Sequence, residues 1–236
     1  SLANGFGSQD VRDWFERIAR LDETVRQAEF VVEPKIDGLT VVLHYKDGSF
    51  SLGATRGDGE VGEDISENLR TLPTIPLRIP LDGDLTSPER LVVRGEVYMT
   101  KSDFAELNAR LSEAGEKTYL NPRNTAAGSL RQLDPRMTAK RPLKILVYQI
   151  IESSDPTPTT QWETLNYLQN LGFPVSNINR HVTDIESAIR FCETQADQRN
   201  QWPFEADGIV IKINDLKLAE RLGYVGKDPR GAIAYK

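Results

Sequence analysis

Apolar residues recur at every second position between residues 30 and 36, a pattern typical of a β-strand whose two faces differ. One face carries Phe30, Val32, Pro34 and Ile36. The other carries Val31, Glu33, Lys35 and Asp37. The charged face has two interpretations, a solvated side of an edge strand or a row of reactive groups beneath a ligand. Gly38 then allows the backbone to turn or to approach another group closely.

The rest of the pattern predicts further strands at 39–45, 50–56, 90–99, 142–151 and 207–215. Helices are predicted at 8–21, after the glycine-rich loop that begins at residue 55, and at 100–111, 160–171 and 184–195. "KDGS" at 46–49 predicts a hairpin turn, and Thr100 with Asp103 a capping box. Helices do not alternate with strands one for one. The pattern therefore favours an α+β fold with mainly antiparallel sheets and flanking helices.

Composition narrows the class of protein. The 236 residues are 39% hydrophobic and 27% charged, as in ordinary globular proteins. We find no apolar run near the ~20 residues of a membrane span and no signal peptide, so no membrane association is expected. Cys192 is the only cysteine, and His44 and His181 are the only histidines. These counts exclude a disulfide scaffold and a cysteine-rich zinc site, argue against a histidine-rich metal site, and favour a reducing cytoplasm.

Charge is unevenly distributed along the chain. The total is −6, but the stretch from 117 to 144 carries +6, so the remainder carries −12. Its basic residues are Lys117, Arg123, Arg131, Arg136, Lys140, Arg141 and Lys144, and Asp134 is its one acid. This basic segment either directs a polyanion such as DNA to one face or is simply solvated surface.

Six motifs together carry a family resemblance. They are "KIDG" at 35–38, "TRGDG" at 55–59, "RGEVYM" at 94–99, "NPRNTAAGSLRQLDP" at 121–135, "ADGIVIKI" at 206–213 and "GAIAYK" at 231–236. In order and spacing the chain resembles the adenylation domain of bacterial NAD-dependent DNA ligases over essentially all 236 residues. This implies the nucleotidyltransferase (ATP-grasp-like) fold of covalent ligases. The alternative is an ATP-dependent polynucleotide ligase or a capping-type nucleotidyltransferase, against which the 121–135 block argues.

The resemblance implies a covalent reaction. Lys35 attacks the α-phosphate of NAD, nicotinamide mononucleotide (NMN) leaves, and a lysyl-AMP intermediate remains. AMP then passes to the 5′-phosphate of a nick in double-stranded DNA, which is sealed during replication and repair. Mg²⁺ or Mn²⁺ is the implied metal, near Asp37 and Asp207. Asp37 is expected to orient Lys35 or to help to hold this metal.

The resemblance also assigns roles around the nucleotide. Glu33 accepts a hydrogen bond from the adenine amino group, Tyr148 stacks on adenine, and Glu96 binds the ribose. Arg56 reaches the ribose or a phosphate, and Lys212 and Lys236 contact the phosphate. Ser1 and Leu2 match a segment that touches the nucleotide. Arg123 and Arg131 grip DNA phosphates.

Structural alternatives remain open for several of these residues. Glu33 and Lys212 could point to water, Arg56 could form a plain salt bridge, and Tyr148 could be an ordinary core aromatic. Glu96 could pair internally with Arg94.

The chain starts without methionine and ends in an apolar run, so we expect a domain excised from a longer, monomeric ligase. By resemblance, the nicotinamide-binding segment, OB-fold, zinc finger and helix-hairpin-helix lie outside it, and these domains of the same chain are its partners. The parent is expected in the bacterial cytoplasm, at the nucleoid when working. Two other classes are a non-catalytic nucleotide- or DNA-binding module and a Schiff-base lysine enzyme.

Overall fold

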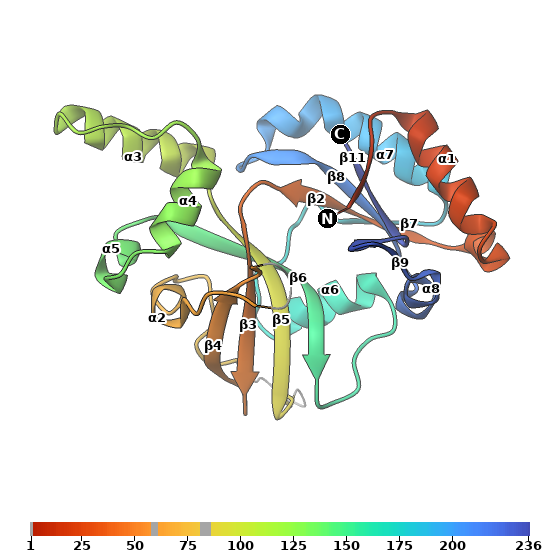
Figure 1. Cartoon of the computed structure of the whole chain (residues 1–236), viewed down its shortest axis with the longest axis horizontal. Coiled ribbons are helices and arrows are strands. Elements are labelled where there is room, and N and C mark those ends of the chain that lie inside the picture. The colour runs from red at the N-terminus through yellow and green to blue at the C-terminus, as the bar shows by residue number, and fades with distance from the viewer. Residues whose placement is uncertain (1, 58–60, 81–85) are drawn as a thin grey trace.

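Two β-sheets with flanking helices make up the computed structural model, which describes residues 2–57, 61–80 and 86–236 (Figure 1). The first sheet has the order β1-β11-β8-β2-β7, formed by Ala3–Gly5, Ala232–Tyr235, Ala206–Ile213, Phe30–Ile36 and Arg180–Val182. The second has the order β4-β3-β5-β6, formed by Ser49–Thr55, Leu39–Lys46, Arg90–Met99 and Leu143–Ser153. All pairs are antiparallel except β1 with β11. The predicted α+β class is confirmed.

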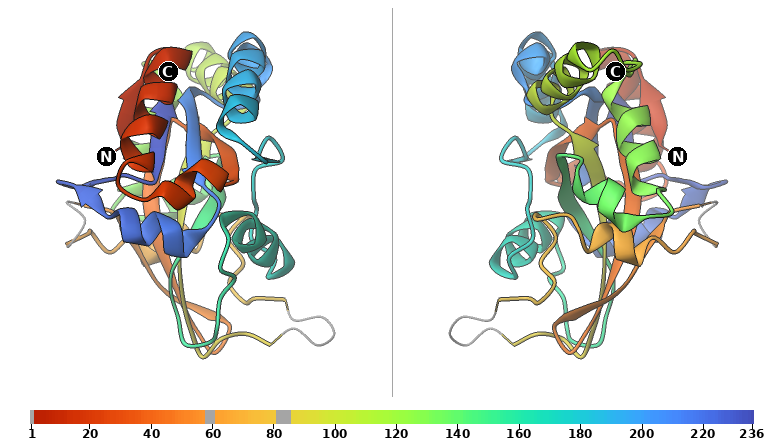
Figure 2. Two further views of the ribbon diagram at one scale, coloured as in Figure 1. Left: turned by 90° about the vertical axis from the view of Figure 1, so that its right-hand side faces the viewer. Right: turned by 90° about the vertical axis from the view of Figure 1, so that its left-hand side faces the viewer.

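Each sheet has its own core. The first packs on α1 (Ser8–Ala19), α7 (Ile185–Gln198) and α8 (Leu216–Leu222), which lie on its outer side (Figure 2). Helix α1 buries Val11, Trp14 and Ile18, as its apolar stripe predicts. The second sheet packs on α2 (Ser66–Leu69), α4 (Pro122–Leu130) and α6 (Gln161–Asn170). The two clusters are distinct, but Tyr98 of β5 and Leu146 of β6 pack with the first sheet's cluster and so join the two sheets.

Strands β2 and β3 follow one another in the chain but belong to different sheets. Gly38 lies at the crossing, where a Cβ atom would stand 2.2 Å from the carbonyl oxygen of Val97. The interpretation of β2 as an edge strand is wrong, because β2 lies between β8 and β7. Glu33 on its charged face is only 5% exposed.

Most predicted elements are present with shifts of one to three residues at their ends. Thr100 caps α3 (Lys101–Glu113) and accepts a hydrogen bond from the Asp103 backbone N–H at 3.1 Å. The pattern missed α4, α5 (Pro135–Ala139), α8, the short strands β1 and β7, the terminal strand β11 and the hairpin of β9 (Tyr224–Val225) and β10 (Asp228–Pro229). It also missed the 3-10 turns η1 (Glu23–Gln27) and η2 (Arg199–Gln201). Across the described ranges, no helix is both long enough and apolar enough to cross a membrane.

Candidate active site

The antiparallel pairing of β2 with β8 brings Lys35 to Asp207. Ile36 is in register with Ala206, and a bulge interrupts the pairing between Pro34 and Ile36. Lys35 Nζ lies 3.0 Å from Asp207 Oδ2, and Lys236 Nζ lies 2.9 Å from the same oxygen. Burial opposes ionisation of Asp207, but the hydrogen bonds from Lys236 and Lys35 outweigh it and lower the pKa of Asp207.

Gly208 explains how Lys236 reaches this carboxylate. Glycine adopts its φ of 118° readily, whereas other residues rarely do. A Cβ atom at this position would lie 2.2 Å from the carbonyl oxygen of Tyr235. The start of β8 can therefore approach the end of β11 closely. The backbone N–H of Lys236 donates to Gly5 O at 2.9 Å, which ties the same end to β1.

A second group of polar side chains lies further along the same face of the sheet. Lys212 is opposite Val31 in the register, so it shares a face with Glu33. Lys212 Nζ lies 2.8 Å from Glu33 Oε2 and 5.1 Å from the centre of the Tyr148 ring. Glu33 and Lys212 therefore do not simply face water, and Tyr148 presents its ring to a cation.

Gln161 completes this group, and the sequence analysis did not identify it. Its Nε2 atom donates to Glu33 Oε1 at 2.7 Å and to the carbonyl oxygen of Tyr148 at 2.9 Å. Gln161 is the first residue of α6, after the cap Thr160. A cap predicts where a helix starts but not which distant residues its first side chain meets, so the sequence held no signal for this contact.

The second sheet contributes Glu96, which is directly opposite Thr40 on β3. Thr40 Oγ1 donates to Glu96 Oε2 at 2.9 Å. Burial raises the pKa of Glu96 to about 7, although the Thr40 hydrogen bond and the charges of Arg123 and Lys35 oppose the shift. Burial also raises the pKa of Tyr148. The alternative pairing of Arg94 with Glu96 is not what the structure shows, since Arg94 Nη1 donates to Gln149 Oε1 at 3.1 Å.

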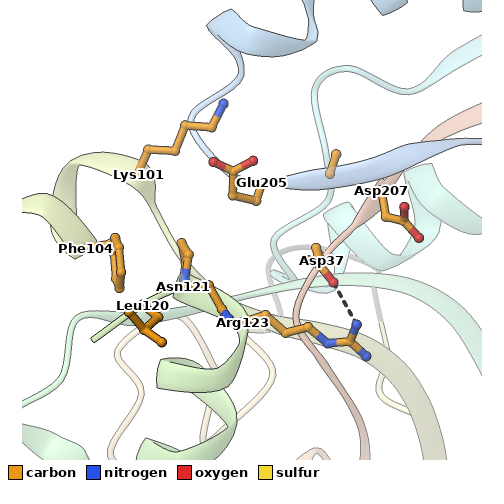
Figure 3. Close-up of a pocket in the computed structure, with 10 residues that line it drawn as sticks. Asp37, Lys101, Phe104, Leu120, Asn121, Arg123, Glu205 and Asp207 are labelled. Atoms are coloured by element: carbon orange, nitrogen blue, oxygen red, sulfur yellow. Dashed lines mark ion pairs between the residues drawn. The ribbon is translucent and has the colours of Figure 1, made fainter. Parts of the chain in front are cut away.

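Asp37 is paired with Arg123, at 3.1 Å between Oδ1 and Nη1 (Figure 3). The structure thus places Asp207, and not Asp37, against the amine of Lys35. The extra residue of the bulge lies in β8, where Asp207 and Gly208 together are opposite Lys35, so Asp207 is next to Lys35 across the strand pair. Arg131 forms an ion pair with Glu63, with 3.4 Å between Nε and Oε2.

The remaining predicted residues lie at the ends of elements. Arg56 is exposed just after β4, and its backbone N–H donates to Thr40 O at 3.1 Å, next to the strand pair that carries Glu96. Leu2 is half-buried before β1. Ser1 and residues 58–60, which include the last two residues of the "TRGDG" motif, lie outside the described residues.

A cavity of about 590 Å³ lies beside Asp37 and Asp207 (Figure 3). The start of α3 supplies Lys101 and Phe104 to it, and the start of α4 supplies Leu120, Asn121, Pro122 and Arg123. Glu205, Ala206 and Asp207 form the opposite wall. The described residues contain no cluster of three or more His, Cys, Asp or Glu side chains placed to hold a metal ion. A metal here would need further ligands from a substrate, as Mg²⁺ commonly has from phosphates.

Comparison with known proteins identifies the class. A DNA ligase of Chloroflexus aurantiacus is 50% identical over 243 residues, which cover all of this chain and 34% of that protein. A DNA ligase of Roseiflexus sp. is 47% identical over 248 residues and one of Syntrophus aciditrophicus 46% over 236, again with this whole chain and 34% and 35% of the relative. The chain is thus similar to DNA ligases and spans about a third of their length.

The family model described as the NAD-dependent DNA ligase adenylation domain matches residues 1–236, and the chain belongs to that family. A solved mycobacterial DNA ligase D, complexed with ATP and MES, gives a TM-score of 0.47 at 12% identity over 88% of this chain and 54% of that one. This likeness is too distant to add to the assignment. The resemblance to the adenylation domain of NAD-dependent ligases is confirmed, and an ATP-dependent ligase is not favoured.

Proposed function

We propose that this chain catalyses transfer of AMP from NAD to Lys35, the first step of nick sealing by an NAD-dependent DNA ligase. The observation that carries the proposal is the arrangement of Lys35 and Lys236 around one carboxylate oxygen of Asp207. An amine must lose its proton before it attacks phosphorus. Among the residues that the structure describes, Asp207 is the carboxylate within hydrogen-bond reach of that proton.

The neighbouring residues account for binding of the adenosine half of NAD. Tyr148 offers a ring for stacking on adenine, and Glu33 offers carboxylate oxygens to its amino group. Glu96 would bind the ribose hydroxyls, and Arg56 would reach the ribose or a phosphate. Lys212 and Lys236 supply positive charge at the α-phosphate, where negative charge develops as the P–O bond to NMN breaks and the bond from Lys35 Nζ forms.

Metal and DNA complete the proposal. Asp37 and Asp207 would hold Mg²⁺ or Mn²⁺ together with substrate phosphates, and the metal would stabilise the charge on those phosphates. Arg123 and Arg131 would exchange their carboxylate partners for phosphates of a nicked duplex. AMP then moves to the 5′-phosphate, and the 3′-hydroxyl displaces it. The parent would act as a monomer in replication and repair, in the cytoplasm and at the nucleoid, with its other domains closing around DNA.

The test is the position of the AMP adduct in the full-length parent after incubation with NAD and magnesium. Intact mass should show one AMP, and peptide mapping should place it on Lys35. Lys35→Arg should abolish the adduct, because guanidinium stays protonated, while Lys217→Arg at an exposed site on α8 should not. An adduct on Lys212 or Lys236 would refute the assignment. ATP in place of NAD tests the alternative donor.

A further inference from the structure

Gln161 is a buried polar side chain whose two amide hydrogens are both committed to the proposed adenine pocket. It is 4% exposed. One partner is the Glu33 carboxylate at 2.7 Å, and the other is the carbonyl oxygen of Tyr148 at 2.9 Å. Both partners accept only, so the amide nitrogen and not the amide oxygen must face them. The contact therefore joins the residue proposed to read the base to the strand that carries the stacking ring.

The backbone around Gln161 is held firmly to both sheets. Its N–H donates to Asn214 O at 2.7 Å, just beyond β8, and the Trp162 N–H donates to Asn214 Oδ1 at 3.0 Å. Helix α6 also packs on the second sheet, through Leu168 and Tyr167 among others. The backbone of Gln161 therefore has a fixed position relative to β8 and β6. Its side-chain amide can hold these two strands at a constant separation.

The position of Gln161 fixes the orientation of the Glu33 carboxylate. Gln161 occupies one lone pair of Oε1 and Lys212 one of Oε2, at 2.7 and 2.8 Å. Two donors on different oxygens fix the plane of the carboxylate, and each oxygen keeps a lone pair. A donor on the edge of a base stacked on Tyr148 can meet one of these. A base without such a donor leaves a buried charged acceptor short of a hydrogen bond, which is costly.

We infer that Gln161 is a positioning residue that orients Glu33 and thereby makes the pocket select a purine with an exocyclic amino group. This inference rests on the proposed function. The bond to Tyr148 goes to its backbone carbonyl and not to its ring, so the effect of Gln161 should pass through Glu33 and appear only with ligands that carry the amino group. A merely structural link between the sheets would weaken all adenosine-like ligands equally.

The experiment compares AMP with purine riboside 5′-monophosphate, which lacks the amino group, by calorimetry. The full-length ligase carries Lys35→Met throughout, so that no adduct forms. Gln161→Met keeps the side-chain length and removes both donors. It should weaken AMP binding about tenfold and the analogue less than about twofold. Gln161→Leu provides a second variant if the first does not fold. In a ligase that also carries Glu33→Gln, Gln161→Met should no longer change the ratio of the affinity for AMP to the affinity for the analogue.

The matched control is Thr164→Val, also buried on α6, whose hydroxyl donates within the helix to Thr160 O at 2.8 Å. It should leave the ratio of the two affinities unchanged. Equal weakening of both ligands by Gln161→Met, or no weakening, would overturn the inference while the proposed function stands. So would a wild-type pocket that binds both ligands equally. Failure of the Lys35→Met ligase to bind AMP at all would instead overturn the proposed function and this inference together.

Discussion

Lys35 Nζ lies 3.0 Å from Asp207 Oδ2, although 172 positions separate the two residues in the chain. The pairing of β2 with β8 creates this contact, and Lys236 on the far side of β8 shares it. The carboxylate is partly exposed, so the pair adds little to stability in water. The pair is therefore expected to contribute to the reaction rather than to the stability of the fold.

Asp207→Asn should slow lysyl-AMP formation in the parent ligase at least tenfold, because it removes the proton acceptor beside Lys35. The free energy of unfolding should change by less than about 1 kcal/mol. Intact mass over time measures the first quantity and urea unfolding the second. Glu113→Gln, at an exposed site near the end of α3, is the control. An unchanged rate in Asp207→Asn would show that another group takes the proton.

Glu96 should make stability depend on pH. Burial raises its pKa from the ordinary value of 4.5 to about 7 in the folded chain, so between these pH values the folded state holds a proton that the unfolded state releases. The stabilisation is complete below pH 4.5 and is lost as pH rises through 7. Relative to Glu96→Gln, the free energy of unfolding of the wild type should fall by about 3 kcal/mol between pH 4.5 and 8. Urea unfolding of both proteins across this range measures it, and parallel curves would contradict the raised pKa.

Arg123 and Arg131 should contribute to DNA binding without regard to sequence. Among the described residues, Arg123 pairs with Asp37 and Arg131 with Glu63, and a phosphate can replace either carboxylate. In the full-length ligase, Arg123→Ala and Arg131→Ala should each weaken binding to nicked duplexes of any sequence. Each should also reduce the slope of log affinity against log salt by about one.

The control for these arginines is Arg26→Ala, a comparably exposed arginine paired with Glu16 near α1. Fluorescence anisotropy over a salt series provides the slopes. Unchanged slopes in both arginine variants would mean that the basic segment is only solvated surface.

Replacement of two glycines by alanine should change the free energy of unfolding in opposite directions. At Gly38 the new Cβ would lie 2.2 Å from Val97 O, a backbone atom that cannot move freely, so Gly38→Ala should destabilise by more than about 2 kcal/mol. At Gly128, inside α4, no atom beyond that helix's own backbone lies within 4 Å of the new Cβ. Gly128→Ala should stabilise by roughly 0.5–1 kcal/mol, because alanine favours the helix. Urea unfolding tests both, and a tolerated Gly38→Ala would contradict the crowded crossing between the sheets.

Strand β5 shows what local pattern can predict. Its bounds match the prediction because its faces alternate clearly and a cap at Thr100 ends it. Helices α4 and α5 were missed because the 121–135 block has little apolar periodicity. A local signal was nevertheless present, since Asn121 and Asp134 each precede a proline and each caps the helix that follows.

The site was predictable only in part, for a physical reason. Motifs identify Lys35, Asp207, Lys212 and Lys236, but the partner of each amine depends on strand register. The bulge in β8 and its pairing with β2 bring Asp207 to Lys35, while Asp37 pairs with Arg123. Gln161 reaches Glu33 from 128 positions away, through packing that no local pattern records.

The order of strands in the first sheet has a consequence for synthesis on the ribosome. Strands β1 and β2 lie within the first 36 residues, whereas β7, β8 and β11, which pair with them, begin at residue 180 or later. The second sheet, residues 39–153, can close meanwhile. At about 5–20 residues per second, β2 waits roughly 9–35 s for β8. Helix α1 can already cover the apolar face of β2, but both edges of β2 stay unpaired during that interval, which makes the emerging chain a candidate for chaperone binding before it can bind any nucleotide.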